Sequence, residues 1–441
     1  DRTGAAAAAA FALLSLSQGV YGVFAHATHF VILPAVAGAL LLARALGAGG
    51  GAGAAPGRLS LLLASGALFG LAFVMKQHGI FFVLFGAAWL VWELARRGVR
   101  PPGIAARGAA RLAGTALPFA LTCILLARAG VFKDFWFWTF DYAREYVSEV
   151  PLSRGAPIFA QAIQAVTAPA LPLWILALAG LAAPLWDGPA RSRWPFTASL
   201  VLASFAAVCP GFYFREHYFV LLLPAVALLA AIAAGAAGRA LTRWLAAGRG
   251  AGDHGLAAIL PGLVFASFLL YPVYQERAFF FSMTPREASR QTYGPNPFPE
   301  AVEIARHIAA DTTAGDRVAV LGSEPEIFFY SGRRSATSHI YMYGLMENQP
   351  YARRMQQEAI QQIEAAAPKY LVFVNVPQSW LGRPDSDTSI LTWSRAYIPE
   401  HYEVAGVVDI VSDDSTVYVW GEEAIEYVPR SPYVVYLFRR R

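Results

Sequence analysis

Long apolar stretches separated by short polar connections fill most of the first 281 residues. They lie at 11–23, 31–46, 59–74, 80–92, 112–129, 158–185, 196–209, 219–237 and 256–281. Each approaches or exceeds the roughly 20 residues with which a helix crosses a bilayer. The pattern predicts a polytopic α-helical membrane domain over 1–281, with about nine spans.

Beyond residue 281 the apolar runs shorten to strand length and charged residues return. The runs predict strands at 318–321, 369–376, 402–411 and 416–420, and helices after Glu324-Pro325, at 351–366 and at 388–396. The final "YVVYLFRRR" is too short to span a membrane and predicts one more strand. Residues 282–441 are therefore predicted to form a small soluble α/β domain with crossover connections.

The composition supports a membrane protein. Hydrophobic residues make up 56% of the chain and charged residues only 15%, with a mean hydropathy of +0.43, outside the usual soluble balance. Both cysteines, Cys123 and Cys209, lie in predicted spans, which argues against a disulfide framework. The pI of 9.2 comes from arginines in loops, and no nucleic-acid motif is present. The expected surroundings are a lipid bilayer, with no nucleic acid as a partner.

Arginines gather in alternate connections between the predicted spans. They are Arg44 and Arg58, then Arg96, Arg97, Arg100, Arg107 and Arg111, then Arg191 and Arg193, then Arg239, Arg243 and Arg249. The positive-inside rule predicts that these connections are cytoplasmic. The other connections, at 24–29, 75–79, 130–157 and 210–218, are then extracytoplasmic together with the 282–441 domain.

Two extracytoplasmic connections carry candidate phosphate ligands. Lys76, one of only three lysines, is followed by Gln77 and His78; an ammonium at the head of a span suits an anionic group such as phosphate. The alternative is an interfacial anchor whose stem snorkels to the headgroups. The second connection, at 210–218, includes Arg215 and His217, which could bind a phosphate or move a proton. Its alternative is a local pair in which Glu216 neutralises Arg215, with Tyr213 in an aromatic belt.

Weaker candidates lie on the same side. An aromatic-rich segment at 131–149 predicts an interfacial helix, on which Asp141, Arg144 and Glu145 could bind sugar hydroxyls or hold the helix together. His26 and His29 are one helical turn apart, but no local carboxylate or cysteine completes a metal site. We therefore assign no metal and no certain cofactor; a divalent metal stays an alternative without support.

Four segments together resemble a known family. They are "FAHATHFVILPAVAGALLLARAL" (24–46), "GLAFVMKQHGIFFVLFG" (70–86), "FYFREHYFVLLLP" (212–224) and "LGSEPEIFFYSGRRSAT" (321–337). The chain resembles bacterial membrane glycosyltransferases of the GT-C class, in the branch of dolichyl-phosphate-mannose-protein mannosyltransferases and aminoarabinose transferases (glycosyltransferase family 39-like). The resemblance implies a multi-pass protein of the bacterial cytoplasmic (inner) membrane. It also implies transfer of a sugar, as a hexosyl or pentosyl transferase, from a polyprenyl-phosphate donor to a lipid, glycan or protein acceptor outside the cytoplasm.

The same resemblance implies that the catalytic carboxylate lies in a loop before the spans seen here. The chain opens with Asp1-Arg2 directly before an alanine-rich span, and its first methionine is Met75, so we expect N-terminal spans and the general base to lie upstream of Asp1. Where the family often has an acidic residue, this chain has Thr28. Lys76 matches a family lysine, and Arg215 and His217 fall in a loop expected to approach the donor phosphate.

Two other functions remain open from the sequence. A transporter or flippase of lipid-linked sugars predicts ionisable groups near mid-span and repeated halves, and neither is evident. A non-catalytic membrane scaffold would use its soluble domain to bind a partner.

Overall fold

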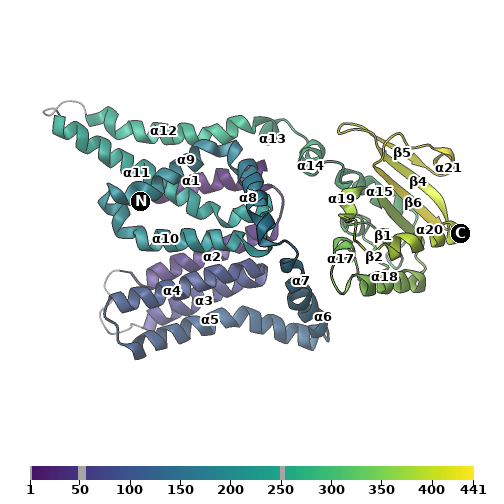
Figure 1. The fold of residues 1–441 in the computed structure, drawn as a ribbon, viewed down its shortest axis with the longest axis horizontal. Coiled ribbons are helices and arrows are strands. Elements are labelled where there is room, and N and C mark those ends of the chain that lie inside the picture. The colour runs from purple at the N-terminus through teal and green to yellow at the C-terminus, as the bar shows by residue number, and fades with distance from the viewer. Residues whose placement is uncertain (1, 48–55, 249–253) are drawn as a thin grey trace. The chain divides into compact units, whose positions relative to one another are not determined.

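A computed structural model describes residues 2–47, 56–248 and 254–441 (Figure 1). Arg249, one of the arginines used above for orientation, lies outside these residues. The chain separates into two compact units, Asp1–Phe280 and Phe281–Arg441, and each is described by itself.

The first unit consists of helices joined by short connections. Its longer helices are α1 (Arg2–Leu16), α2 (Ala27–Ala45), α3 (Pro56–Met75), α4 (Ile80–Arg96), α5 (Pro101–Arg128), α8 (Leu152–Thr167), α9 (Leu171–Ala182), α10 (Gly188–Val208), α11 (Leu223–Gly248) and α12 (His254–Gln275). Among the described residues, five helices are long and apolar enough to cross a membrane: Ala27–Ala45, Gln77–Arg96, Pro101–Arg128, Leu152–Leu185 and Leu223–Leu245. Arg2–Leu16, Leu59–Met75 and Ile259–Gln275 are shorter apolar helices. The unit is therefore a multi-span helical membrane unit, while the number nine stays a prediction.

Prolines and cap residues account for where the helices differ from the apolar pattern. The single stretch predicted at 158–185 is divided into α8 and α9 by a 3-10 turn, Ala168–Ala170, that contains Pro169, since proline removes a backbone donor. The basic segment predicted as a loop up to residue 111 is instead helical from Pro101, because proline is well suited to the first turn of a helix. This places Arg107 and Arg111 within α5.

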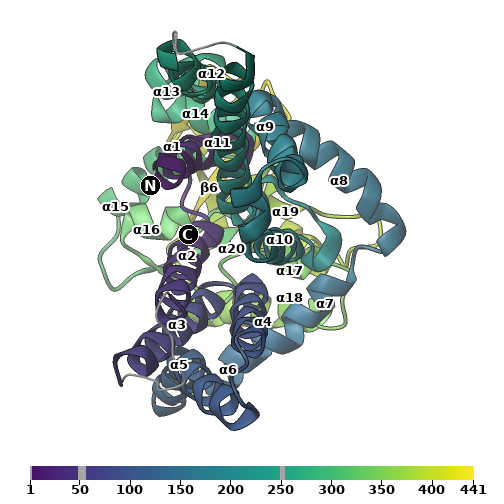
Figure 2. The same cartoon turned by 90° about the vertical axis from the view of Figure 1, so that its left-hand side faces the viewer.

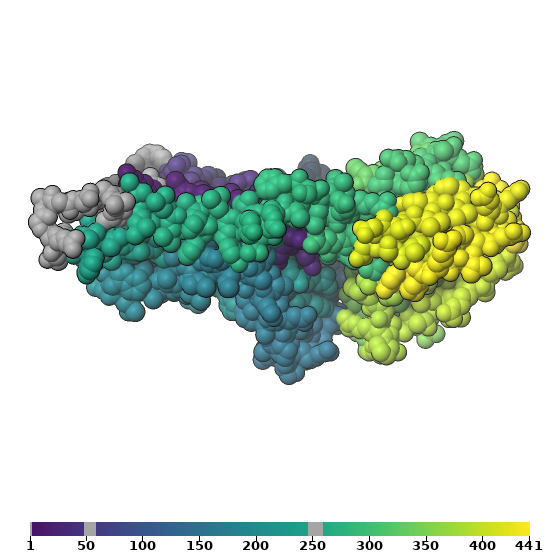
Figure 3. Space-filling model, turned by 90° about the horizontal axis from the view of Figure 1, so that it is seen from above, coloured from purple at the N-terminus to yellow at the C-terminus, as the bar shows by residue number. Residues whose placement is uncertain are grey.

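Glycines allow α3 and α5 to pack with their backbones in close contact. A Cβ at Gly114 would lie 2.0 Å from the Leu63 carbonyl oxygen, and one at Gly66 would lie 2.1 Å from the Arg111 carbonyl oxygen. Small residues permit such close approach between membrane helices. In both ribbon views, α5 and α12 lie at opposite edges of the unit (Figures 1 and 2), and α12 faces the viewer in the space-filling view (Figure 3).

Arg111 is buried inside α5 rather than exposed in a cytoplasmic loop, as the sequence had suggested. Its side chain donates a hydrogen bond from Nη2 to the Val83 carbonyl oxygen at 2.9 Å, and its guanidinium lies 4.9 Å from the centre of the Phe69 ring. A Cβ at Gly86 would lie 2.4 Å from Nη2. Arg111 therefore joins α3, α4 and α5.

The second unit contains a six-stranded mixed sheet of order β2-β1-β3-β6-β4-β5. The strands are β1 (Arg317–Leu321), β2 (Arg334–Ser335), β3 (Tyr370–Asn375), β4 (Tyr402–Ile410), β5 (Thr416–Trp420) and β6 (Val434–Arg440). β1 is parallel to both β2 and β3, whereas β3, β6, β4 and β5 are antiparallel neighbours. The predicted strands are confirmed, and only the two-residue β2 was not predicted.

Helices connect and cover this sheet. They are α14 (Pro285–Tyr293), α15 (Phe298–Ala310), α16 (Glu326–Ser331), α17 (Tyr343–Met346), α18 (Ala352–Ala366), α19 (Pro377–Trp380), α20 (Ser389–His401) and α21 (Glu423–Glu426). α18 and α20 confirm the helices predicted at 351–366 and 388–396. α15 contributes Ala301, Ile304 and Ile308 to the same buried cluster as Val320 and Val372 of the central strands.

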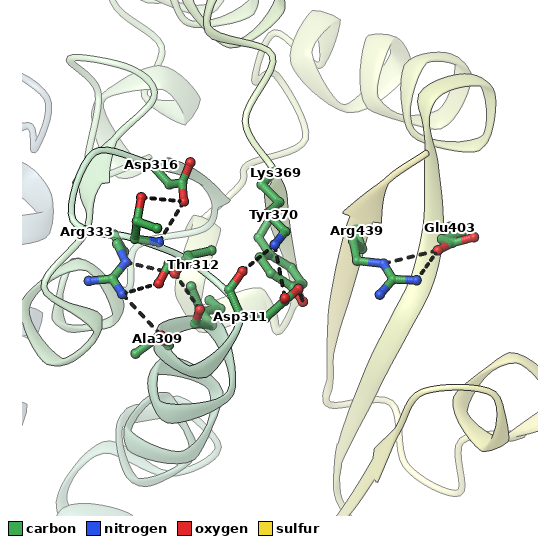
Figure 4. A network of polar contacts seen from close by, with 11 residues as sticks. Ala309, Asp311, Thr312, Asp316, Arg333, Lys369, Tyr370, Glu403 and Arg439 are labelled. Carbon is green, nitrogen blue, oxygen red and sulfur yellow. Dashed lines mark hydrogen bonds and ion pairs between the residues drawn. The ribbon is translucent and has the colours of Figure 1, made fainter.

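Polar contacts join the C-terminal end of α15 to the sheet (Figure 4). Asp311 forms an ion pair with Lys369 at 3.0 Å and accepts a hydrogen bond from the Tyr370 hydroxyl at 2.7 Å. Arg333 donates to the Thr312 hydroxyl and to the Ala309 and Thr312 carbonyl oxygens. These contacts fix the end of α15 against the start of β3 and the residue before β2, and they give Lys369 a structural role.

Candidate functional site

Four connections of the membrane unit meet through side-chain contacts. They are the segment between α1 and α2, the Lys76–Gly79 turn between α3 and α4, the segment between α5 and α8, and the turn between α10 and α11. The segment after α5 is helical, as predicted, and consists of α6 (Phe132–Trp136), a π-helical turn (Phe137–Asp141) and α7 (Tyr142–Ser148). Because successive helices alternate in direction, these connections share one end of the unit, opposite the arginine-rich end.

Lys76 lies at the centre of these contacts. Its Nζ is 3.9 Å from the centre of the Tyr218 ring, which comes from the turn before α11. The side chain is half-buried, and among the described residues no carboxylate lies within ion-pair distance of it. A half-buried ammonium that is held on an aromatic face and lacks a counter-charge can receive an anion.

Gln77 and His78 hold the Lys76 turn to neighbouring segments. His78 is buried, with Nδ1 2.8 Å from the Ala207 carbonyl oxygen of α10 and its ring 4.9 Å from that of Tyr218. Gln77 donates from Nε2 to the Thr139 carbonyl oxygen at 3.2 Å. His78 is thus positioned to support the turn, whereas Lys76 and Gln77 are the residues that ligand can reach.

Histidines from two connections stack beside this turn. The rings of His26 and His217 are 4.2 Å apart and nearly parallel, at 9°, and Tyr21 stacks on the same pair. In the described part of the chain, His217 Nδ1 is buried and lacks a hydrogen-bond partner. A buried orphan nitrogen needs a partner from water or ligand, so His217 is a candidate to contact one.

Two carboxylates at the site are hydrogen-bonded to tyrosines. The Tyr213 hydroxyl donates to Glu149 Oε2 at 2.6 Å, and its ring stacks on Tyr146 at 4.7 Å. Glu216 hydrogen-bonds with the Tyr21 side chain. Arg215 lies over the Tyr213 ring, at 5.4 Å. Glu149, Glu216 and Arg215 therefore each contact a tyrosine of the site.

Three residues in these connections have backbone angles in the left-handed region. Five non-glycine residues in the described chain have positive φ, and three of them are here: Tyr21 (55°), Phe212 (54°) and Phe214 (42°). Such conformations cost energy for ordinary side chains and persist where the surrounding structure imposes them, often at functional sites.

Asp141, Arg144 and Glu145 make no side-chain contact with this cluster that is found among the described residues, and His29 contacts it through its backbone N–H, which donates to the His26 carbonyl oxygen at 3.0 Å. Arg144 and Glu145 pair with each other at 4.0 Å, and Asp141 is exposed. Both ring nitrogens of His29 and the Thr28 hydroxyl are buried without hydrogen-bond partners. Within the described ranges, no group of three or more His, Cys, Asp or Glu side chains could hold a metal.

The structure adds residues that sequence reasoning did not select. None of Tyr218, Glu149 and Tyr21 was selected from the sequence as a site residue. The partner of Glu149 is 64 positions away along the chain, and the partner of Tyr21 is 195 positions away. No local sequence pattern therefore identifies these residues.

A second polar cluster lies in the C-terminal unit, after the parallel strands β1 and β3. Glu324 is buried and accepts a hydrogen bond from the Ser379 hydroxyl at 2.9 Å. Burial raises the pKa of Glu324 to about 8, and burial raises the pKa of Glu326 to about 7. Both carboxyl groups therefore keep their protons to a higher pH than exposed ones.

At this end of the helical membrane unit, a half-buried lysine lacks a carboxylate partner among the described residues, and comparison with known proteins extends this description. No protein-family model and no curated protein sequence matches the chain. Among solved structures it is similar to ArnT from Cupriavidus metallidurans bound to undecaprenyl phosphate, at 16% identity and a TM-score of 0.54, covering 98% of this chain and 79% of that one. This likeness shows a shared fold and confirms, at that level, the resemblance to GT-C glycosyltransferases.

A second similarity is more distant. The oligosaccharyltransferase AglB from Archaeoglobus fulgidus, in complex with an inhibitory peptide and a dolichol-phosphate, is 12% identical at a TM-score of 0.46, over 98% of this chain and 61% of that one. The chain therefore spans less than two thirds of AglB, and the TM-score is too low to establish a common fold.

Proposed function

We propose that this protein is an integral-membrane glycosyltransferase that uses a polyprenyl-phosphate-linked sugar as its donor. The observation that carries the proposal is the Lys76 ammonium, which is half-buried at a membrane-helix end and has no carboxylate partner in the described chain. A lipid phosphate supplies the missing negative charge. The ArnT fold supports the proposal, since that protein was solved with undecaprenyl phosphate.

The reaction follows from where charge develops. The bond between the anomeric carbon and the phosphate oxygen breaks, the acceptor oxygen bonds to that carbon, and the acceptor proton passes to a base. The leaving lipid phosphate gains negative charge, which Lys76 and Arg215 would stabilise. Gln77 and His217 would line the same phosphate site, and His78, which the sequence suggested as a phosphate ligand, would support it together with Tyr213 and Glu216. We assign no residue of this chain as the base.

The finer assignments belong to the same proposal. The protein would lie in a bacterial cytoplasmic membrane, with the Lys76 end and residues 282–441 on the extracytoplasmic side, as the arginine distribution predicts. The sugar is a hexose or pentose unit, and the acceptor is a lipid, glycan or protein. Asp141, Arg144, Glu145, His26 and His29 are candidates for contacts to sugar or acceptor.

Sugar transfer in membranes that contain the natural full-length protein tests this proposal. We expect Lys76→Ala to abolish the glycosylated product detected by mass spectrometry, because the leaving phosphate loses its nearest cation. Lys133→Ala is a matched control, since Lys133 is an exposed lysine of α6 in a connection at the same end of the unit.

Equal product from the wild type and from Lys76→Ala, at equal expression, would exclude this role for Lys76. The transporter alternative has one supporting observation, the buried ionisable Arg111 inside a span. A transporter would move the intact lipid-linked sugar across the membrane without forming a glycosylated acceptor, so the same assay separates the two functions.

A further inference from the structure

A cavity of about 350 Å³ opens on the C-terminal unit where α14, α15 and the edge strand β5 meet. Its volume lies at the small end of the range for ligand sites, roughly 300 to 1,000 Å³. Its lining consists of Arg286 of α14, Pro299, Val302, Glu303 and Arg306 of α15, and Tyr418 of β5. The proposed glycosyl transfer uses none of these residues.

One face of α15 contributes most of this lining. Pro299, Val302, Glu303 and Arg306 follow the i, i+3, i+4, i+7 spacing that brings side chains to the same side of a helix. Pro299 and Val302 are apolar, and Glu303 and Arg306 continue the same face with polar groups. The cavity therefore offers an apolar surface directly beside hydrogen-bonding groups.

Contacts on both sides of Tyr418 hold β5 against α15. Alternate residues of a strand point to the same side of a sheet, so Tyr418 shares a face with Thr416 and Trp420. Thr416 donates a hydrogen bond to Glu300 Oε1 at 2.7 Å, and the ring of Trp420 stacks on that of His307 at 4.2 Å. Since Glu300 and His307 both belong to α15, Tyr418 also faces this helix. This wall is thus fixed before a ligand binds, which lowers the ordering cost of binding.

The charges of the lining are paired. Arg306 forms an ion pair with Glu303 at 2.8 Å, and Arg286 lies 3.6 Å from the buried Glu300. Glu300 also pairs with the buried Arg290, at 2.5 Å. Because each charged group of the lining already faces an opposite charge, a bare anion or cation gains little here.

Hydrogen-bonding groups of both kinds remain at the cavity. Among the described residues Arg306 donates only through Nη1 and Arg286 only through Nη2, so each guanidinium keeps N–H groups for a ligand. Glu303 Oε1 and the Tyr418 hydroxyl likewise make no hydrogen bond within that part of the chain. A sugar hydroxyl can both donate and accept, whereas a phosphate ion mainly accepts and an ammonium group only donates. The combination of donors, acceptors and an aromatic ring therefore suits a polyhydroxylated ligand.

We propose that this cavity binds a neutral carbohydrate, with a pyranose ring against Tyr418 and its hydroxyl groups hydrogen-bonded to Glu303 and Arg306. A small anion would leave Glu303 Oε1 and the apolar surface unused, and an alkyl chain would leave the polar groups unpaired. The inference is independent of the proposed glycosyl transfer, because the C-terminal unit can hold a glycan whether or not the membrane unit transfers a sugar.

Saturation-transfer NMR of the full-length protein, in nanodiscs free of glycoside detergent, tests this inference. The probes are the uncharged methyl glycosides of glucose, galactose and mannose, and we expect saturable binding of at least one. Tyr418→Leu should weaken it about twofold to tenfold, the effect of a lost aromatic contact. Arg306→Ala should weaken it by a similar factor through lost hydrogen bonds. Since the Arg306 side chain is 72% exposed, this second variant should fold like the wild type.

Tyr330→Leu is the matched control, because Tyr330 is an exposed tyrosine of α16 in the same unit and does not line the cavity. Its affinity should equal that of the wild type. Absence of binding by all three glycosides would overturn the proposal, and so would equal affinity in the wild type, Tyr418→Leu and Arg306→Ala. Displacement of the glycoside by an equal concentration of inorganic phosphate would overturn it as well, by showing a site for an anion.

Discussion

At the residue scale, the Lys76 ammonium has no carboxylate partner among the described residues. Lys76 could have been neutralised by Glu149 or Glu216, which belong to neighbouring connections, yet these carboxylates bond to Tyr213 and Tyr21. Since removing a cation from water without a counter-charge is costly, the arrangement makes sense if an anion arrives from outside.

The aromatic partner of Lys76 gives a prediction at this scale. Tyr218→Leu removes the ring beneath the ammonium, so we expect binding of a polyprenyl phosphate to weaken by about twofold to thirtyfold, the range of a cation–π contact. Tyr218→Phe keeps the ring and should bind like the wild type. Titration of the lipid against intrinsic fluorescence measures both, and a loss in Tyr218→Phe equal to that in Tyr218→Leu would contradict the role of the ring.

Helix packing depends on glycine positions that hydropathy does not reveal. The apolar pattern located the helical stretches of the membrane unit, because burial in lipid requires long apolar runs. It did not locate the helix ends that depend on other features. α5 begins earlier, at Pro101, and α1 includes the alanine-rich residues before the predicted apolar stretch. The apolar pattern also left Arg111 in a loop, since its burial depends on Gly86 and Phe69 of other helices.

Two glycines of α5 give a matched pair for testing this packing. In Gly114→Ala the new methyl group would lie 2.0 Å from the Leu63 carbonyl oxygen, whereas at Gly108 it would meet nothing within 4 Å. We expect Gly114→Ala to lower the thermal midpoint in detergent by several degrees, because α3 and α5 must separate. Gly108→Ala should be neutral or slightly stabilising, by up to about 1 kcal/mol, as alanine favours helix. Equal midpoints for the two variants would contradict the close packing.

The candidate site was predictable in part. Lys76, Arg215 and His217 could be selected because charges in short connections between spans are conspicuous in sequence. Their partners could not, since Ala207 reaches the Lys76 turn through the packing of α10 against α4, and Tyr218 reaches it through the packing of the turn before α11 against α2 and α10. The C-terminal strands were predicted well because each is a short apolar run bounded by polar residues. The two-residue β2 offers no such run.

The whole molecule combines a membrane unit with a C-terminal α/β unit that has its own response to pH. The folded-state pKa of Glu324, about 8, lies well above the roughly 4.3 of an unfolded chain. Between these values the folded unit holds a proton that the unfolded chain has released, so stability falls as pH rises from about 5 to 8. Glu326, with a pKa of about 7, acts in the same direction.

Hydrogen exchange of β1 and β3 amides in the full protein measures this effect. Corrected for intrinsic rates, protection should decrease from pH 5 to pH 8, by a few kcal/mol at about 1.4 kcal/mol per pKa unit. Glu324→Gln should flatten the dependence, leaving the part due to Glu326. Glu422→Gln, at an exposed carboxylate, should behave like the wild type. An unchanged pH dependence in Glu324→Gln would show that Glu324 is not the group responsible.

Binding of undecaprenyl phosphate to the purified full-length protein tests the central claim most directly, because it requires neither the sugar nor the acceptor. We predict saturable binding that Lys76→Ala weakens about tenfold to a hundredfold, the worth of a charge-assisted hydrogen bond, and that Lys133→Ala leaves unchanged. Equal affinity in the wild type and Lys76→Ala would contradict the account.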